Sequence, residues 1–84
     1  MTNFKTIEKL QMEIDTNGAV LEFKDHVIVA FQIYTGEFEA EIYEFIDSKD
    51  DFDTIECRLD LIEKSTTRFK DGGSAIEWCI NKLK

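Results

Sequence analysis

Proline, histidine, cysteine and long apolar runs are absent or scarce in this sequence. Among 84 residues there is no proline, one histidine and two cysteines. No stretch approaches the roughly 18 apolar residues that a membrane-spanning helix needs, and residues 1–5 lack the features of a signal peptide. Cys57 and Cys79 do not have the spacing of a metal site or a redox motif. We therefore expect a cytoplasmic protein, with no membrane partner, whose cysteines are reduced core residues.

The rest of the composition is that of one globular domain. Hydrophobic residues make up 43% of the chain and aromatic residues 12%, which is enough apolar material for a core in a chain this short. No repeat, linker or low-complexity segment interrupts the sequence. Residues 1–84 are therefore expected to fold as a single domain.

Basic residues are few, and the acidic residues are concentrated in one region. The net charge is −8, and residues 37–63 carry eleven acidic residues against two basic ones. Binding to nucleic-acid phosphates requires a basic surface, so direct nucleic-acid binding is not expected. The basic cluster Lys64, Arg68 and Lys70 directly follows the acidic region, which would repel a polyanion within a Debye length of about 8 Å.

The N-terminal segment has the periodicity of an amphipathic helix. Its apolar residues recur three or four positions apart and are Phe4, Ile7, Leu10 and Ile14. Thr2 or Asn3 is expected to cap the start of this helix. Asn17-Gly18 is expected to end it in the left-handed conformation.

The C-terminal segment also predicts a helix. It follows a break at residues 71–73 and begins with the capping box Ser74–Glu77, in which the two side chains bond to opposite ends of the first turn. Its apolar stripe consists of Ile76, Cys79, Ile80 and Leu83.

Four segments between these helices have the character of strands. Residues 19–23 form a short extended run, and residues 26–34 are apolar on both parities, which predicts a central strand buried on both faces. Thr35-Gly36 connects it tightly to a strand over residues 37–46. Residues 54–63 alternate like a strand but also fit a helical stripe, and we favour the strand. The order predicts an α+β fold with an N-terminal helix, an antiparallel sheet of three or four strands, and a C-terminal helix.

The segment 37–46 has two different faces, because successive side chains of a strand alternate. One face has Phe38, Ala40, Ile42 and Ile46. The other has Glu37, Glu39, Glu41, Tyr43 and Phe45. If the first faces the core, the second presents three carboxylates, followed by two aromatic rings unless a helix covers them. No local residue is expected to neutralise the three glutamates, so an external basic partner would explain why they are kept.

Neither catalysis nor metal binding is predicted. His26 begins an apolar strand, and no sequence signature provides a nucleophile, an orienting carboxylate and an oxyanion hole around it. A chain this short also leaves little room for a substrate pocket of about 300 Å³ or more. Residues 47–53 fail as a calcium loop, because Lys49 and Phe52 stand where a carboxylate and a glycine are required. We therefore expect no enzyme activity, no metal and no cofactor.

The acidic face is the strongest candidate for function. Carboxylates on a rigid sheet are similar to a run of phosphates for a partner whose groove is lined with lysine and arginine, and exposed aromatics are typical interface anchors. The alternative is a solvated surface that only maintains solubility. The residues predicted to bind a partner are Glu37, Glu39, Glu41, Tyr43, Glu44, Phe45, Asp47, Asp50, Asp51, Asp53 and Glu56.

The acidic strand 37–41, its aspartate-rich loop and the helix–strands–helix order resemble small phage-type inhibitors of host nucleic-acid enzymes. That class includes anti-CRISPR proteins that act on Cas nucleases and the uracil-DNA glycosylase inhibitor. The resemblance implies a DNA-mimicking inhibitor that docks into the basic groove of a host nucleic-acid-binding protein. Leu21-Glu22-Phe23 does not match the Glu-Ser-Ile strand of the glycosylase inhibitor, so a Cas nuclease is the favoured partner.

Three alternatives to this interpretation stay open from the sequence alone. The first is a protein similar to the glycosylase inhibitor. The second is a small phage or plasmid accessory or assembly protein that forms a homo-oligomer, such as a homodimer, through Tyr43, Phe45 and Trp78. The third is a hydrolase that uses acidic residues and a metal.

Overall fold

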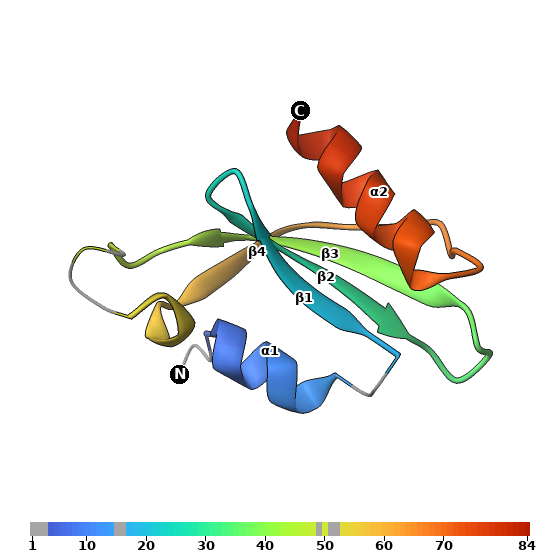
Figure 1. Ribbon diagram of the computed structural model, residues 1–84, viewed down its shortest axis with the longest axis horizontal. Helices are drawn as coiled ribbons and strands as arrows, with labels where there is room; N and C mark the ends of the chain where they lie inside the picture. Colours follow the sequence, from blue (N-terminus) through green and yellow to red (C-terminus); the bar gives the residue numbers. More distant parts are fainter. Residues whose placement is uncertain (1–3, 15–16, 49, 51–52) are drawn as a thin grey trace.

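A computed structural model describes residues 4–14, 17–48, 50 and 53–84. In chain order its elements are α1 (Ile7–Glu13), β1 (Ala19–Phe23), β2 (His26–Gln32), β3 (Phe38–Phe45), the 3₁₀ turn η1 (Thr54–Glu56), β4 (Leu59–Lys64) and α2 (Gly72–Leu83). The predicted α+β fold is confirmed, with four strands between the two helices (Figure 1).

The strands form one antiparallel sheet in the order β1-β2-β3-β4, and the two helices lie on opposite faces of it (Figure 1). On the α2 face the buried residues are Ile28, Ala30, Phe38, Ala40, Ile42, Ala75 and Cys79. On the α1 face they are Ile7, Leu10, Val27, Val29, Tyr43 and Leu59. The sheet is therefore the middle layer between two cores.

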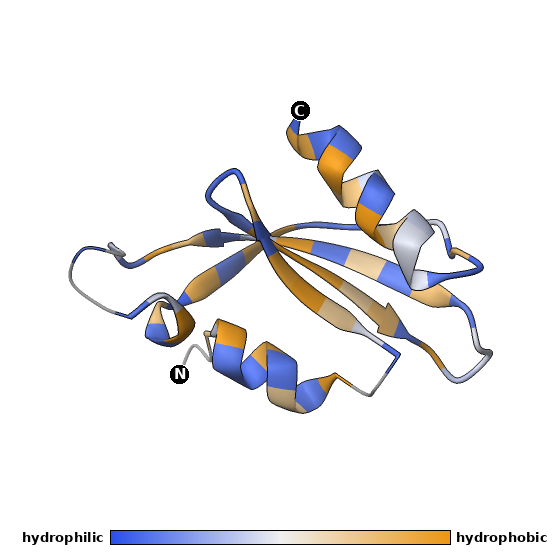
Figure 2. Ribbon diagram, viewed as in Figure 1, coloured by the Kyte–Doolittle hydropathy of each residue, from blue (hydrophilic) through white to orange (hydrophobic). Residues whose placement is uncertain are grey.

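β2 supplies side chains to both cores. Residues 27–30 are all buried, which confirms the central strand predicted from their apolar character on both parities. Ile28 lies opposite Ile42 of β3, and each is about 1% exposed. Burying such a side chain stabilises the fold by about 1.5–3 kcal/mol. The apolar stripes of both helices appear in orange in Figure 2.

The ends of α1 differ from the prediction. Thr6 caps the helix by accepting a hydrogen bond from the backbone N–H of Lys9 at 3.1 Å; Thr2 and Asn3 lie outside the described residues. The helix ends at Glu13, and Ile14 is already extended. Gly18 does not adopt the left-handed conformation, which among the described residues occurs at Lys24, Asp25 and Gly36. The prediction of a Gly18 stop was wrong, because the helix ends at Glu13, five residues earlier.

The start of α2 also differs. Asp71 caps it by accepting a hydrogen bond from the backbone N–H of Ser74 at 2.7 Å, and the helix begins at Gly72. The predicted capping box at Ser74 is wrong, because Asp71 stands three residues before Ser74, where its carboxylate reaches that N–H. The glycines predicted to form a break are therefore the first turn of the helix.

The strands β2, β3 and β4 are shorter than predicted. Residues 33–36 form the turn between β2 and β3, where Gly36 has a φ of 91°. Ile46, expected in the core, is 43% exposed because it lies beyond β3, where its N–H bonds to the carbonyl oxygen of Arg58. In the ambiguous segment 54–63, the strand is confirmed from Leu59 onwards, whereas residues 54–56 form a 3₁₀ turn.

Within the described residues, neither helix is long and apolar enough to cross a membrane.

Candidate functional site

A cavity of about 330 Å³ lies between α1 and the sheet. Residues from α1 and its flanks, from β2 and from β3 line it: Lys5, Leu10, Glu13, Ile14, Val29, Phe31, Gln32, Glu41 and Tyr43. This cavity is partly open to solvent, so it is not a fully buried pocket of the kind for which a chain this short leaves little room. α1 has only seven residues and packs chiefly against β1 and η1, so it leaves part of the β2–β3 surface uncovered.

A tyrosine and a glutamate of β3 meet in this cavity. The Tyr43 hydroxyl donates a hydrogen bond to Oε1 of Glu41 at 2.9 Å. Burial raises the pKa of Tyr43 far above its ordinary value, and the hydrogen bond to Glu41 and the charges of Glu41 and Glu13 raise it further. Tyr43 therefore stays protonated and acts as a donor, whereas the Glu41 carboxylate keeps further acceptor positions for another group.

Three further polar groups surround the cavity. The Lys5 ammonium bonds to both carboxylate oxygens of Glu13 at 2.6 Å, and these side chains are 39% and 55% exposed. Gln32 accepts a hydrogen bond from Asn17 at 2.7 Å. The floor includes the half-buried ring of Phe31. An aromatic ring and several hydrogen-bond acceptors thus converge on one concave space.

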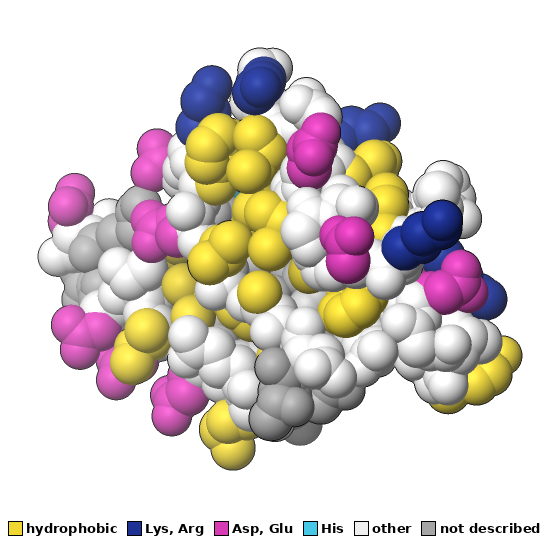
Figure 3. Space-filling model, turned by 45° about the vertical axis from the view of Figure 1, so that its right-hand side comes forward, with side chains coloured by type: hydrophobic (Ala, Val, Ile, Leu, Met, Phe, Trp, Pro, Cys, Tyr) yellow, Lys and Arg dark blue, Asp and Glu magenta, His cyan; other side chains and the backbone are white. Residues whose placement is uncertain are grey.

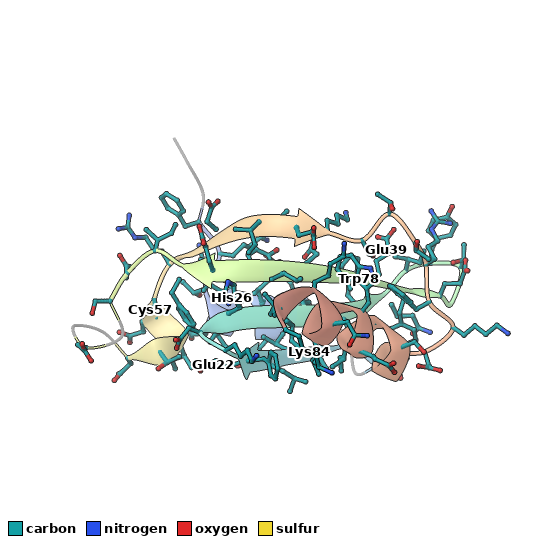
Figure 4. All side chains as sticks on the ribbon, turned by 90° about the horizontal axis from the view of Figure 1, so that it is seen from above. Glu22, His26, Glu39, Cys57, Trp78 and Lys84 are labelled. Atoms are coloured by element: carbon teal, nitrogen blue, oxygen red, sulfur yellow. The ribbon has the colours of Figure 1, made fainter. Side chains whose placement is uncertain are left out.

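The glutamates of β3 do not form the exposed array that the sequence predicts. Glu37 is exposed and accepts a hydrogen bond from the Thr35 hydroxyl at 3.1 Å. The Glu39 side chain is 20% exposed and lies 3.8 Å from the guanidinium of Arg68, and Figure 4 shows it at the opposite end of the sheet from His26. Glu41 lines the cavity. The expectation that nothing local neutralises these residues was therefore wrong for Glu39, because the chain after β4 brings Arg68 beside it.

The two aromatics predicted on the same face are covered. Tyr43 is 4% exposed and belongs to the α1 core, and Phe45 is half-buried against that core. The sequence left open whether a helix covers them, and α1 does so. Tyr43 is therefore unavailable as a surface anchor, either for a basic partner or for the apolar homo-oligomer.

The acidic surface that remains lies at one end of the sheet. Glu44 and Asp60 are exposed and directly opposite each other on β3 and β4. Figure 3 shows acidic side chains gathered on its left, near the β3–β4 connection. Among the other predicted residues there, Asp50, Asp53 and Glu56 are exposed, and Asp51 lies outside the described residues.

Asp47 is held by an arginine within this acidic end. Its carboxylate accepts hydrogen bonds from the guanidinium of Arg58 at 2.8–3.1 Å and from the Arg58 backbone N–H at 2.9 Å. The side-chain bond to Arg58, followed by the backbone bond, lowers the pKa of Asp47. Asp47 therefore joins the chain just after β3 to the chain just before β4.

The histidine and the cysteines take structural positions. The Nδ1 atom of His26 lies 2.8 Å from the carbonyl oxygen of Lys24 in the β1–β2 hairpin. Cys57 and Cys79 are both buried thiols, and burial, aided by Glu63, raises the pKa of Cys79 to about 11. The prediction that both cysteines are core residues is confirmed. Within the described residues no cluster of three or more His, Cys, Asp or Glu side chains is placed to hold a metal.

Comparison with protein families identifies the chain over nearly its whole length. The model of the family Nucleotide modification associated domain 4 matches residues 1–83. The chain belongs to this family. No curated protein and no solved structure matches it. The family description names an association with nucleotide modification, and the cavity beneath α1 is a concave site in the described part of this member.

Sequence reasoning did not predict the cavity residues Lys5, Glu13, Phe31 and Gln32. One feature of the sequence did indicate that this face of the sheet is covered. Because residues 26–34 are apolar on both parities, a layer must cover each face of the sheet, and the face with Glu41 and Tyr43 is one of them. The sequence does not reveal how much of that face a seven-residue helix leaves open.

Proposed function

We propose that this domain binds a nucleobase in the cavity beneath α1, and that it serves nucleotide modification as a recognition module and not as the catalyst. One observation carries the proposal: an aromatic ring and a carboxylate with spare acceptor positions share a cavity of about 330 Å³. Pockets for small molecules have about this size and combine apolar walls with a few convergent polar groups. The family's association with nucleotide modification supports this ligand class.

The chemistry of a nucleobase matches the walls of the cavity. A base has a flat face, and stacking on an aromatic side chain is worth about 1–3 kcal/mol. Phe31 offers such a ring, and the Lys64 ammonium, which lies 5.8 Å from its centroid, would move aside for the base. Its edge carries N–H groups, which the Glu41 carboxylate accepts. Leu10 and Val29 supply apolar wall beside these contacts.

A binding role fits this site better than catalysis. Tyr43 places a hydroxyl in the cavity, but its raised pKa keeps this group protonated near neutral pH, so it cannot accept a proton from a substrate. His26 pairs with Glu44 in the register and so lies on the α2 side of the sheet, away from the cavity. The two thiols suit a reducing compartment, so we place this function in the cytoplasm.

The test is titration of the protein with the common nucleosides, followed by ligand NMR or calorimetry. We expect at least one nucleoside to bind, and Glu41→Gln to weaken its binding about tenfold, because a charged acceptor is replaced by a neutral one of the same shape. Glu37→Gln is the matched control, since Glu37 shares the parity of Glu41 but lies outside the cavity. If no nucleoside binds, or if both variants bind equally well, the proposal fails.

A second candidate is inhibition of a host nucleic-acid enzyme, with a Cas-type nuclease as the favoured partner. The observation in its favour is the pair Glu44 and Asp60, because like charges directly opposite each other destabilise a sheet. A basic groove that docks on this acidic end would offset the repulsion between the two carboxylates. This candidate uses the β3–β4 end and not the array of Glu37, Glu39 and Glu41.

The second candidate is tested by DNA cleavage with a purified Cas-type nuclease. The protein is expected to slow cleavage, and the double variant Glu44→Lys, Asp60→Lys to relieve the inhibition, more so at low salt. Glu77→Lys, an exposed charge reversal on α2, should leave inhibition unchanged. Equal inhibition by all three proteins would exclude the acidic end as the docking surface.

A further inference from the structure

A second cavity adjoins the nucleobase site. It has a volume of about 480 Å³ and is lined by Phe4, Lys5, Lys9, Met12 and Glu13. Lys5 and Glu13 line both cavities, so their ion pair forms the wall between them. On its face of the sheet α1 has η1 beside it and contacts chiefly η1 and β1 (Figure 1). The two cavities therefore adjoin at two partly exposed side chains.

The two cavities differ in charge. The first is lined by Lys5, Glu13 and Glu41, and Lys64 lies beside it opposite Glu41, so its acidic and basic groups balance. The second is lined by Lys5, Lys9 and Glu13, and so has one more basic than acidic group. The first suits a neutral ring with N–H donors, whereas the second suits an anion. A nucleotide has both parts, joined by a sugar.

We infer that the ligand is a nucleoside 5′-monophosphate, with its base in the first cavity and its phosphate against Lys5 and Lys9 in the second. This inference rests on the proposed function. The Lys5 ammonium exchanges the Glu13 carboxylate for the phosphate when the nucleotide enters. A solvent-exposed ion pair contributes little to stability, so the exchange costs little.

Lys64 offers the competing position for the phosphate. It lies opposite Glu41 on β4, and its ammonium is 5.8 Å from the centroid of the Phe31 ring. A phosphate drawn to Lys64 would stand over the ring on which the base is proposed to stack. Lys9 is the better anchor because it lies outside that ring contact, on the far side of the Lys5–Glu13 pair.

The experiment compares a nucleoside with its own 5′-monophosphate. Their affinities for the whole protein are measured at low salt by calorimetry, using the nucleoside that binds best and its monophosphate. We expect the monophosphate to bind roughly tenfold more tightly, because hydrogen bonds to charged groups are the strong ones. Lys9→Gln should remove most of this preference, and Lys64→Gln should preserve it.

Each outcome decides between the two proposals. Equal binding of nucleoside and monophosphate overturns this inference and leaves the nucleobase site in place. Loss of the preference in Lys64→Gln but not in Lys9→Gln also overturns it, because the phosphate then lies on the opposite side. Absence of binding by both ligands overturns the nucleobase site as well. Lys9 is exposed, so its substitution is compatible with folding, and circular dichroism verifies this.

Discussion

Gly18 leads into β1, and a Cβ atom built on it would stand 2.8 Å from the carbonyl oxygen of Ala30 and 3.0 Å from Cγ2 of Ile14. A glycine is therefore required here because there is no space for a Cβ atom, and not because of the backbone conformation. We expect Gly18→Ala to lower the free energy of unfolding by about 1–3 kcal/mol, the usual cost of overpacking. Urea denaturation measures this change in the free energy of unfolding. Gly73→Ala is the control, because its nearest neighbour would be Asp71 Oδ1 at 3.4 Å; equal losses in both variants would contradict the steric explanation.

Asp71 links the stability of α2 to pH. Its hydrogen bonds from Ser74, the backbone N–H first, lower the pKa of its carboxyl. A lowered folded-state pKa means that the stabilisation is present above the ordinary value of about 3.9 and is lost as the pH falls through the folded-state value. Asp71→Ala should therefore lower the thermal midpoint at neutral pH but hardly at the acidic end of the titration.

The control for this prediction is Glu77→Ala. A capping box at Ser74 would need the Glu77 side chain, whereas a cap by Asp71 does not. Thermal unfolding of the three proteins across the acidic pH range distinguishes the two caps. A pH-independent difference between Asp71→Ala and the unmutated protein would refute the linkage.

Among the elements, α1 is the short cover that creates the cavity. Leu10 is 4% exposed and packs into the core on this face, whereas Met12, two residues on, is 78% exposed. We expect Leu10→Ala to destabilise the protein by about 2–5 kcal/mol and Met12→Ala by less than about 0.5 kcal/mol. Chemical denaturation checks both values. If the two substitutions cost the same, α1 does not pack as described.

Element identities were predictable here, but element ends were not. Residues 26–34 have apolar side chains on both parities, and such a run fits a central strand whatever surrounds it. The helix ends depend on single hydrogen bonds made by Thr6 and Asp71, and neighbouring residues with the same side-chain chemistry compete for those roles. Local sequence therefore leaves the cap undecided.

Across the whole molecule, the fold separates charged residues that are close together in the sequence. Arg68, only eight residues after Asp60, lies beside Glu39, whereas Asp60 lies opposite Glu44 toward the other end of β3. The structure thus sets two acidic residues opposite each other toward one end of β3 and places a basic residue beside Glu39 toward the other.

Neutralising that pair should stabilise the protein. We expect Glu44→Gln or Asp60→Asn to raise the free energy of unfolding by about 0.2–1 kcal/mol at low salt, because like charges directly across a sheet repel, and to have a smaller effect at high salt. Denaturation at two salt concentrations measures this. A loss of stability would indicate that the pair is held by attractive contacts.

The sequence by itself determined the class of fold, the central strand, the buried thiols and the acidity of residues 37–63, because these follow from local composition and periodicity. The tertiary structure decided which carboxylates face water, which one lines a cavity, and that Tyr43 is buried beneath α1. The physical reason is that a strand has two faces, and only the packing of distant elements determines what covers each. The cavity arises where α1, through its short length, leaves part of one face uncovered.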